Sequence, residues 1–185
     1  MNLKTMIREY VPKNEQEEKD KEMFLKYIDT YTDILTRNNE TMHFTSSALV
    51  VNKNRDKVLM VYHNIYNSWA WTGGHADGEC DLLSVAIREV KEETGIKNVA
   101  VLYNGIATID TLGCMGHFKK GKYVAAHIYL SVGYLFEADE EEEIRIKEDE
   151  NSKVGWIKIS DIMNIVTEEH MKPIYQKIIN LIKSI

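Results

Sequence analysis

The stretch that decides the fold is Gly73–Ile96, which reads GGHADGECDLLSVAIREVKEETGI. It opens with two glycines, which let the backbone approach a ligand closely. Asp81 is a typical helix N-cap, and Gly95 is a typical residue just past a helix end. The stretch therefore predicts a glycine-rich loop followed by a helix over Leu82–Thr94.

This predicted helix carries an apolar arc and an acidic face. The apolar arc consists of Leu83, Ala86, Ile87 and Val90, which we expect to face the core. Glu89, Glu92 and Glu93 are spaced i, i+3 and i+4, and we assign them to another face. Like charges so placed cost roughly a few tenths of a kcal/mol per pair in an isolated helix. One interpretation is a solvated acidic face whose charge is partly offset by Arg88 and Lys91. The other is a site for a hard cation such as Mg²⁺, which prefers oxygen ligands. The Gly-Gly loop directly before the helix favours the cation site, because it lets the backbone approach a ligand closely.

The same residues resemble the Nudix box, the signature of the Nudix (MutT-like) hydrolase family. The box has a glycine, five residues, Glu, seven residues, Arg-Glu, an aliphatic residue, any residue, Glu-Glu, any residue, Gly and an aliphatic residue. The positions that match are Gly74, Arg88, Glu89, Val90, Glu92, Glu93, Gly95 and Ile96. The resemblance implies an α/β fold, a Nudix-type α/β/α sandwich with a mixed β-sheet.

One position departs from the box. Its first glutamate should stand at position 80, where this chain has Cys80, and Glu79 stands one residue early. The span from Gly74 to Arg88 is unchanged. We expect a loop shorter by one residue, which leaves Glu79 able to pair with Arg88 or to support the metal shell.

The resemblance also implies a reaction, namely hydrolysis of a diphosphate linkage in a nucleoside diphosphate derivative with Mg²⁺ (or Mn²⁺). The metal ligands would then be Glu89, Glu92, Glu93 and the carbonyl oxygen of Gly74, with Glu92 and Glu93 also counted as catalytic. Arg88 would organise the carboxylates. Family members can add a glutamate from the loop before the last core strand, and Glu150, six residues before Trp156, has such a placement. Glu150 and Glu93 therefore compete for the role of general base.

Substrate contacts are less specified by the sequence. Trp71 could stack on a nucleobase, although the alternation Trp-Ala-Trp-Thr is also typical of a strand with one buried face. His75 could contact a phosphate or fix the loop. Lys122 ends the basic segment His117–Lys122, which could meet phosphates or form an exposed hairpin tip.

The chain before this segment predicts an N-terminal helical extension, and we divide the chain into residues 1–40 and a Nudix hydrolase domain at 41–185. Asn14 is a plausible N-cap for a helix that ends near Leu35, and Phe24, Ile28, Tyr31 and Leu35 form its apolar stripe. This helix could pack on the main domain, cap the active site or form a dimer arm. A homodimer is a further family expectation.

Composition limits the other partners. The net charge of −6 argues against non-specific binding to nucleic acid or to anionic membranes. No run approaches the ~20 apolar residues of a membrane span. Two cysteines without metal-binding spacing suit a reducing cytosol, so we expect a cytoplasmic protein whose partner is a small molecule.

Two other functions deserve comparison with the hydrolase. A non-catalytic module that senses nucleotides or ADP-ribose on a Nudix fold is the main alternative, but such domains usually lose box glutamates that this chain keeps. An isoprenoid diphosphate isomerase on the same fold would place a cysteine in a separate motif, whereas Cys80 lies within the box.

Overall fold

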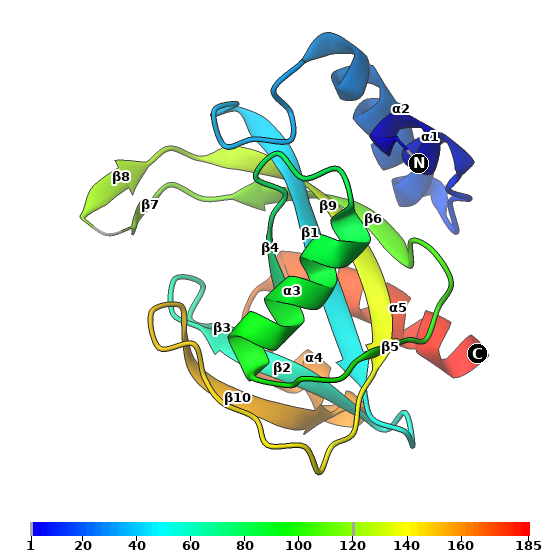
Figure 1. The fold of residues 1–185 in the computed structure, drawn as a ribbon, viewed down its shortest axis with the longest axis vertical. Helices are drawn as coiled ribbons and strands as arrows, with labels where there is room; N and C mark the ends of the chain where they lie inside the picture. The colour runs from blue at the N-terminus through cyan, green and yellow to red at the C-terminus, as the bar shows by residue number, and fades with distance from the viewer. Residues whose placement is uncertain (1, 120) are drawn as a thin grey trace.

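The computed structural model describes residues 2–119 and 121–185, and these form a curled, mixed β-sheet between helices (Figure 1). At its centre β1 (Met42–Val51) runs parallel to β9 (His127–Glu137) over ten paired positions. The strands that extend this sheet in antiparallel fashion are β2 (Lys57–His63), β3 (Ser68–Ala70), β4 (Thr72–His75), β5 (Ala100–Val101), β6 (Thr108–Cys114) and β10 (Asn151–Lys158). The predicted mixed sheet is confirmed.

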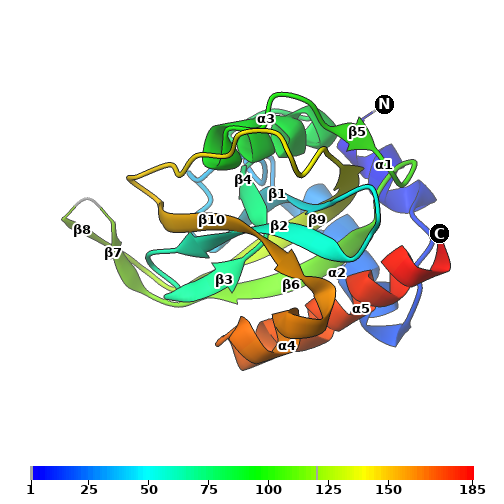
Figure 2. The ribbon, with the colours of Figure 1, turned by 90° about the horizontal axis from the view of Figure 1, so that it is seen from below.

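Helices cover both faces of the sheet, which confirms the predicted α/β/α sandwich. Figure 2 shows α3 (Leu82–Thr94) on one face and α4 (Ile162–Ile165) with α5 (Lys172–Ser184) on the other. Strand β1 serves both layers because side chains alternate along a strand. Phe44 and Val50 belong to the cluster that includes the α3 side, and Leu49 and Val51 to the cluster beneath α5.

The N-terminal segment contains two helices, α1 (Leu3–Glu9) and α2 (Glu15–Thr30). Asn14 caps α2 as predicted, by accepting a hydrogen bond from the Glu17 amide at 2.9 Å. The predicted end at Leu35 is wrong: the helix stops at Thr30, Tyr31 takes an extended conformation, and turns follow. Helix α1 was not predicted.

Helix α2 packs on the chain itself. Phe24 is fully buried, edge-on to Phe44 of β1 with ring centroids 5.3 Å apart. A buried ionic group adds to this contact, because Lys177 of α5 lies 2.9 Å from Glu17 and 2.7 Å from Asp110. Phe24 of the predicted stripe therefore belongs to the chain's own core, with Ile28 and Leu35 packed against it, whereas Tyr31 is exposed. The homodimer stays a prediction that a sizing measurement tests.

Two further segments differ from what their sequences predict. The run Tyr123–Phe136 is rich in β-branched and aromatic residues and predicts one long strand, and Ser160 predicts the cap of a short helix over Asp161–Val166. The run Tyr123–Phe136 is broken, because β8 (Lys122–Val124) pairs with β7 (His117–Lys119) in a projecting hairpin and β9 begins at His127 (Figure 1). Ser160 does not cap a helix over Asp161–Val166. Its hydroxyl donates instead to the Asp161 carboxylate at 2.8 Å, within a 3₁₀ turn (Ile159–Asp161) that precedes α4. A second 3₁₀ turn, Glu169–Met171, precedes α5.

No helix in the described ranges is long and apolar enough to cross a membrane.

Candidate active site

Helix α3 has the ends that its sequence predicts. Asp81 accepts a hydrogen bond from the Ser84 amide at 3.2 Å, which satisfies one of the free amides at the helix start. Gly95 takes the left-handed conformation with φ 77°, which suits a glycine because it lacks Cβ. These two caps set the ends of the helix that carries the glutamates, directly after the glycine-rich loop.

The three glutamates do not share one face, which corrects the sequence-based assignment. At 100° per residue, Glu93 lies nearly in line with Ala86 on the buried side, Glu89 is rotated away from it, and Glu92 farther still. Their burial follows this order, since Glu93 is 3% exposed, Glu89 is half-buried and Glu92 is exposed. The acids therefore fan out from the core to the solvent.

Glu93 is a buried carboxylate held by the scaffold at both oxygens. The Gly73 amide donates to one oxygen at 2.8 Å, and the Asn151 side chain donates to the other at 3.0 Å. Burial nevertheless raises the pKa of Glu93 to about 7, although these two hydrogen bonds act in the opposite direction. The site thus favours a proton here, or a cation in its place.

Glu89 and the two glycines are packed closely together. A Cβ on Gly74 would lie 2.4 Å from the Glu89 carboxyl carbon, and a Cβ on Gly73 would lie 2.8 Å from the Ser46 carbonyl oxygen of β1. Burial also raises the pKa of Glu89, against the lowering effect of the positive charge of Lys147. The glycines therefore let β4 lie against both the helix carboxylate and β1.

Lys147 supplies a positive charge beside these acids and was not singled out from the sequence. Its ammonium lies 2.9 Å from Glu150 and 3.6 Å from Glu92. Burial acts to raise the pKa of Glu150, but the hydrogen bond and charge of Lys147 outweigh it, so the pKa is lowered. Glu150 directly precedes β10 and borders the same cavity as the three box glutamates.

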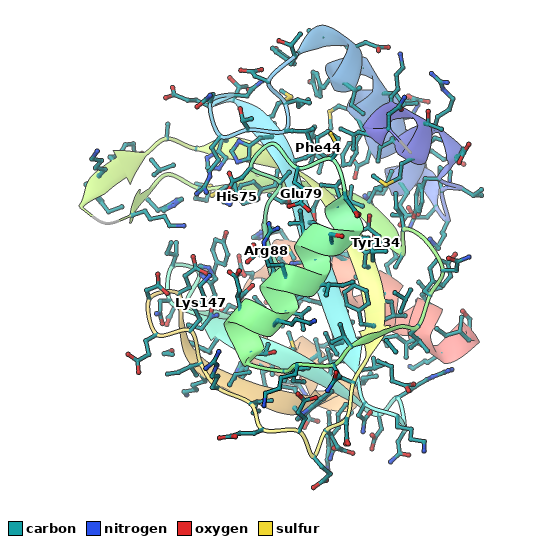
Figure 3. The ribbon with its side chains drawn as sticks, in the orientation of Figure 1. Phe44, His75, Glu79, Arg88, Tyr134 and Lys147 are labelled. Atoms are coloured by element: carbon teal, nitrogen blue, oxygen red, sulfur yellow. The ribbon has the colours of Figure 1, made fainter. Side chains whose placement is uncertain are left out.

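The displaced glutamate of the box still reaches the helix. Glu79 accepts a hydrogen bond from Arg88 at 2.7 Å, whereas Cys80 is exposed. Figure 3 shows Glu79, Arg88 and Lys147 along one side of α3, with His75 at the end of the neighbouring β4. The register shift therefore preserves the Glu–Arg ion pair at the entrance of the helix.

A cavity of about 800 Å³ joins these groups. Trp71 and His75 border it, as do Gly74 and Arg88. Trp71 is half-buried, and its ring meets Tyr175 edge-on at 5.7 Å. The basic segment contributes Lys119, which lies 3.9 Å from Glu150. Lys122 is exposed on β8, outside the residues that border the cavity.

The cavity is also lined by residues that sequence reasoning missed. His43 lies on β1 and His127 begins β9, and the centroid of the His43 ring lies 5.0 Å from that of His127 and 5.0 Å from that of His75. Arg37 pairs with Asp77 beside them. The sequence marked His43 as the start of a strand and placed His127 inside a strand-like run, but the pairing of those strands could not be known in advance.

Comparison with known proteins places this geometry in a family. The NUDIX domain family model matches residues 42–178. An RNA pyrophosphohydrolase of Pelagibacter ubique is 30% identical over 125 residues, which are 64% of this chain and 79% of that protein.

Solved structures share the fold. An Ap4A hydrolase of C. elegans, in a binary complex, has a TM-score of 0.55 at 19% identity, covering 77% of this chain and 98% of its own. A NUDIX family hydrolase from Clostridium perfringens has a TM-score of 0.54 at 23% identity, covering 75% and 97%. This chain therefore belongs to the NUDIX domain family and is a Nudix hydrolase, an enzyme class that hydrolyses pyrophosphate bonds.

Proposed function

We propose that this Nudix hydrolase uses Mg²⁺ or Mn²⁺ to cleave the diphosphate linkage of a nucleoside diphosphate derivative. The observation that carries the proposal is the carboxylate fan of α3, in which Glu93 is buried beside Glu89 at one wall of the cavity. A buried carboxylate with a raised pKa is destabilised when ionised, and a bound cation removes that cost.

The donor set suits a hard cation. The proposed ligands are the side chains of Glu89, Glu92 and Glu93 and the carbonyl oxygen of Gly74, all oxygen atoms at the cavity. Nudix hydrolases generally use divalent metals. Such a metal, when bound, neutralises diphosphate charge and makes an attacking water more acidic. Arg88, held by Glu79, is proposed to position the carboxylates rather than to touch substrate.

Glu150 is our choice of general base, with Glu93 as its competitor. Both oxygens of Glu93 accept hydrogen bonds from the scaffold, which supports the role of a metal ligand rather than a base for this carboxylate. Among residues 2–119 and 121–185, the ion pairs of the Glu150 carboxylate are with the ammonium groups of Lys147 and Lys119 at the cavity. An ionised carboxylate that borders the cavity is suited to accept a proton from water.

The substrate is proposed to lie between the α3 carboxylates and the strands across the cavity. Lys119 and Lys147 place positive charge at the side where phosphates would sit. Trp71 offers a half-buried ring for a nucleobase, and His75 borders the same space. Lys122, which is exposed at the hairpin, would contact only a substrate that extends beyond the cavity.

A pyrophosphate-bearing RNA end is a second candidate substrate. It is favoured by the 30% identity to an RNA pyrophosphohydrolase. The projecting β7–β8 hairpin also exposes two aromatic rings, Phe118 and Tyr123, beside Lys119 and Lys122. Exposed rings between cations can stack on unpaired bases. The charge of −6 argues only against non-specific binding.

A substrate panel tests the proposal. ADP-ribose, a dinucleoside polyphosphate, nucleoside triphosphates and a 5′-triphosphorylated RNA are incubated with Mg²⁺ or Mn²⁺, and products are separated by chromatography. We expect cleavage of a diphosphate linkage in a nucleotide substrate, lost on chelation and in Glu93→Gln. Turnover that survives in the Glu92→Gln/Glu93→Gln double variant contradicts the mechanism, and ADP-ribose binding without product favours the sensing module.

We propose the cytoplasm as the compartment of this protein. Cys80 and Cys114 are free thiols, which fits a reducing compartment.

A further inference from the structure

Three imidazoles meet at the cavity that the carboxylate fan also borders. His43 lies on β1, His75 ends β4 and His127 begins β9. One ring nitrogen of each lies within 4.8 Å of those of the other two, and all three residues border the cavity. Strand β1 pairs with both β4 and β9, so the sheet itself brings the rings together.

The ring of His43 is oriented in a way that leaves one nitrogen free. His43 is 4% exposed, and its Nδ1 lies 3.0 Å from the Asn39 carbonyl oxygen. A carbonyl can only accept, so Nδ1 donates and Nε2 of the neutral ring carries a lone pair. That Nε2 is buried and has no hydrogen-bond partner among the described residues. An unsatisfied buried acceptor costs about 1–3 kcal/mol, and a cation bound at this nitrogen would remove that cost.

His127 repeats this arrangement. Its Nδ1 lies 2.8 Å from the Ala125 carbonyl oxygen, which leaves Nε2 as the ring nitrogen with the lone pair. Histidines that bind metals usually donate their other N–H to a carbonyl or a carboxylate in this manner. The Tyr129 ring lies beside all three imidazoles, with centroids 4.9 to 5.5 Å away, and limits how they can turn.

We propose that His43, His75 and His127 form a second metal site that binds a borderline divalent cation such as Zn²⁺. Imidazole nitrogen suits Zn²⁺, whereas Mg²⁺ prefers oxygen donors such as the carboxylates of α3. Tetrahedral binding at Zn–N distances of about 2.0–2.1 Å requires nitrogens about 3.3 Å apart, so the widest pair closes by about 1.5 Å through ring rotation. Three protein ligands leave a fourth position, which opens to the cavity for a water or a substrate oxygen.

Metal binding without substrate tests this site apart from the proposed hydrolysis. Full-length protein is stripped with a chelator and titrated with Co²⁺ in excess Mg²⁺, in the Glu92→Gln/Glu93→Gln background that removes competing carboxylates. We expect the visible absorption bands of nitrogen-coordinated Co²⁺ at one equivalent, displaced by Zn²⁺. If no such band appears, the three-histidine site is refuted while the hydrolase proposal stands.

Single substitutions in the same background locate the bound ion. His127→Gln, at a half-buried position, should weaken Zn²⁺ binding at least about 10- to 100-fold. That range is typical when a residue that only hydrogen-bonds to a metal ligand is replaced, and loss of a ligand itself should cost no less. His170→Gln is the matched control, because His170 borders the same cavity and pairs with Glu168 but does not belong to the cluster. His43→Gln provides a second test, with folding checked by circular dichroism; if it does not fold, His127→Gln decides. Unchanged Zn²⁺ affinity in His127→Gln overturns the proposal.

Discussion

The two walls of the cavity differ in how the chain builds them. The carboxylate wall comes mainly from adjacent turns of a single helix, α3, which carries Glu89, Glu92 and Glu93 within five consecutive positions. The imidazole wall comes from three strands, with His43 and His127 more than eighty positions apart. One wall offers oxygen and the other nitrogen, so a hard cation and a borderline cation can be held across one cavity without competing.

The largest effect is expected at the edge of the carboxylate wall, at Glu150. Glu150→Gln should lower the turnover rate by about 10²–10⁴-fold and remove the acidic limb of the pH profile, because the variant cannot accept a proton. Glu148→Gln, an exposed neighbour in the same loop, is the control. A normal rate and profile in Glu150→Gln would remove it from the mechanism and assign the base to Glu93.

The next effect concerns Glu93 and the stability of metal-free protein. Its pKa is about 7 in the fold, above the ordinary value of 4.5 that an unfolded chain shows. Between these values the folded protein keeps a proton that the unfolded chain releases, so the free energy of unfolding falls as pH rises. Relative to Glu93→Gln, this loss should be on the order of 3 kcal/mol by pH 8.

Urea unfolding of chelator-treated protein across this pH range measures that loss. Glu92→Gln serves as control, because Glu92 is exposed and should leave the pH dependence of the wild type in place. Added Mg²⁺ should restore stability at high pH. Parallel curves for wild type and Glu93→Gln would show that burial of Glu93 carries no such cost.

A moderate effect is expected where the two walls join, on β4. Gly73→Ala places a methyl 2.8 Å from the Ser46 carbonyl oxygen, so β4 must move away from β1. We expect a loss of about 1–3 kcal/mol in thermal or denaturant unfolding. Gly113→Ala is the matched control, because nothing lies within 4 Å of its added Cβ. Equal stability of the two variants would show that β4 tolerates displacement.

The smallest effect belongs to the Glu79–Arg88 ion pair at the entrance of α3. Both side chains are about two-fifths exposed, at 38% and 42%. A double-mutant cycle of Glu79→Gln and Arg88→Gln should give a coupling energy of at most about 1 kcal/mol, reduced by salt. A coupling well above this, or one that ignores salt, would mean that the displaced glutamate is shielded from solvent and acts as part of the metal wall.

Local sequence rules predicted the features that depend on neighbours along the chain. Helix α3, its Asp81 cap and its Gly95 end follow from capping chemistry, and the strand pair β1–β2 follows from two apolar runs around a turn. The box resemblance added the family and hence the reaction class. Where these rules failed, at Leu35 and Ser160, a helix end or cap depended on contacts that the sequence does not display.

The sequence by itself determined the carboxylate helix and the bond type that this enzyme breaks, because both rest on residues within one turn or two of each other. Only the tertiary structure decided which acid is buried, since the burial of Glu93 depends on β4 and Asn151 lying against it. The histidine cluster likewise exists only through strand pairing, because β1 sets β4 and β9 side by side across a long chain separation. The spacing of residues along a helix sets the direction of each side chain, whereas the packing of the whole sheet decides which residues that side chain contacts.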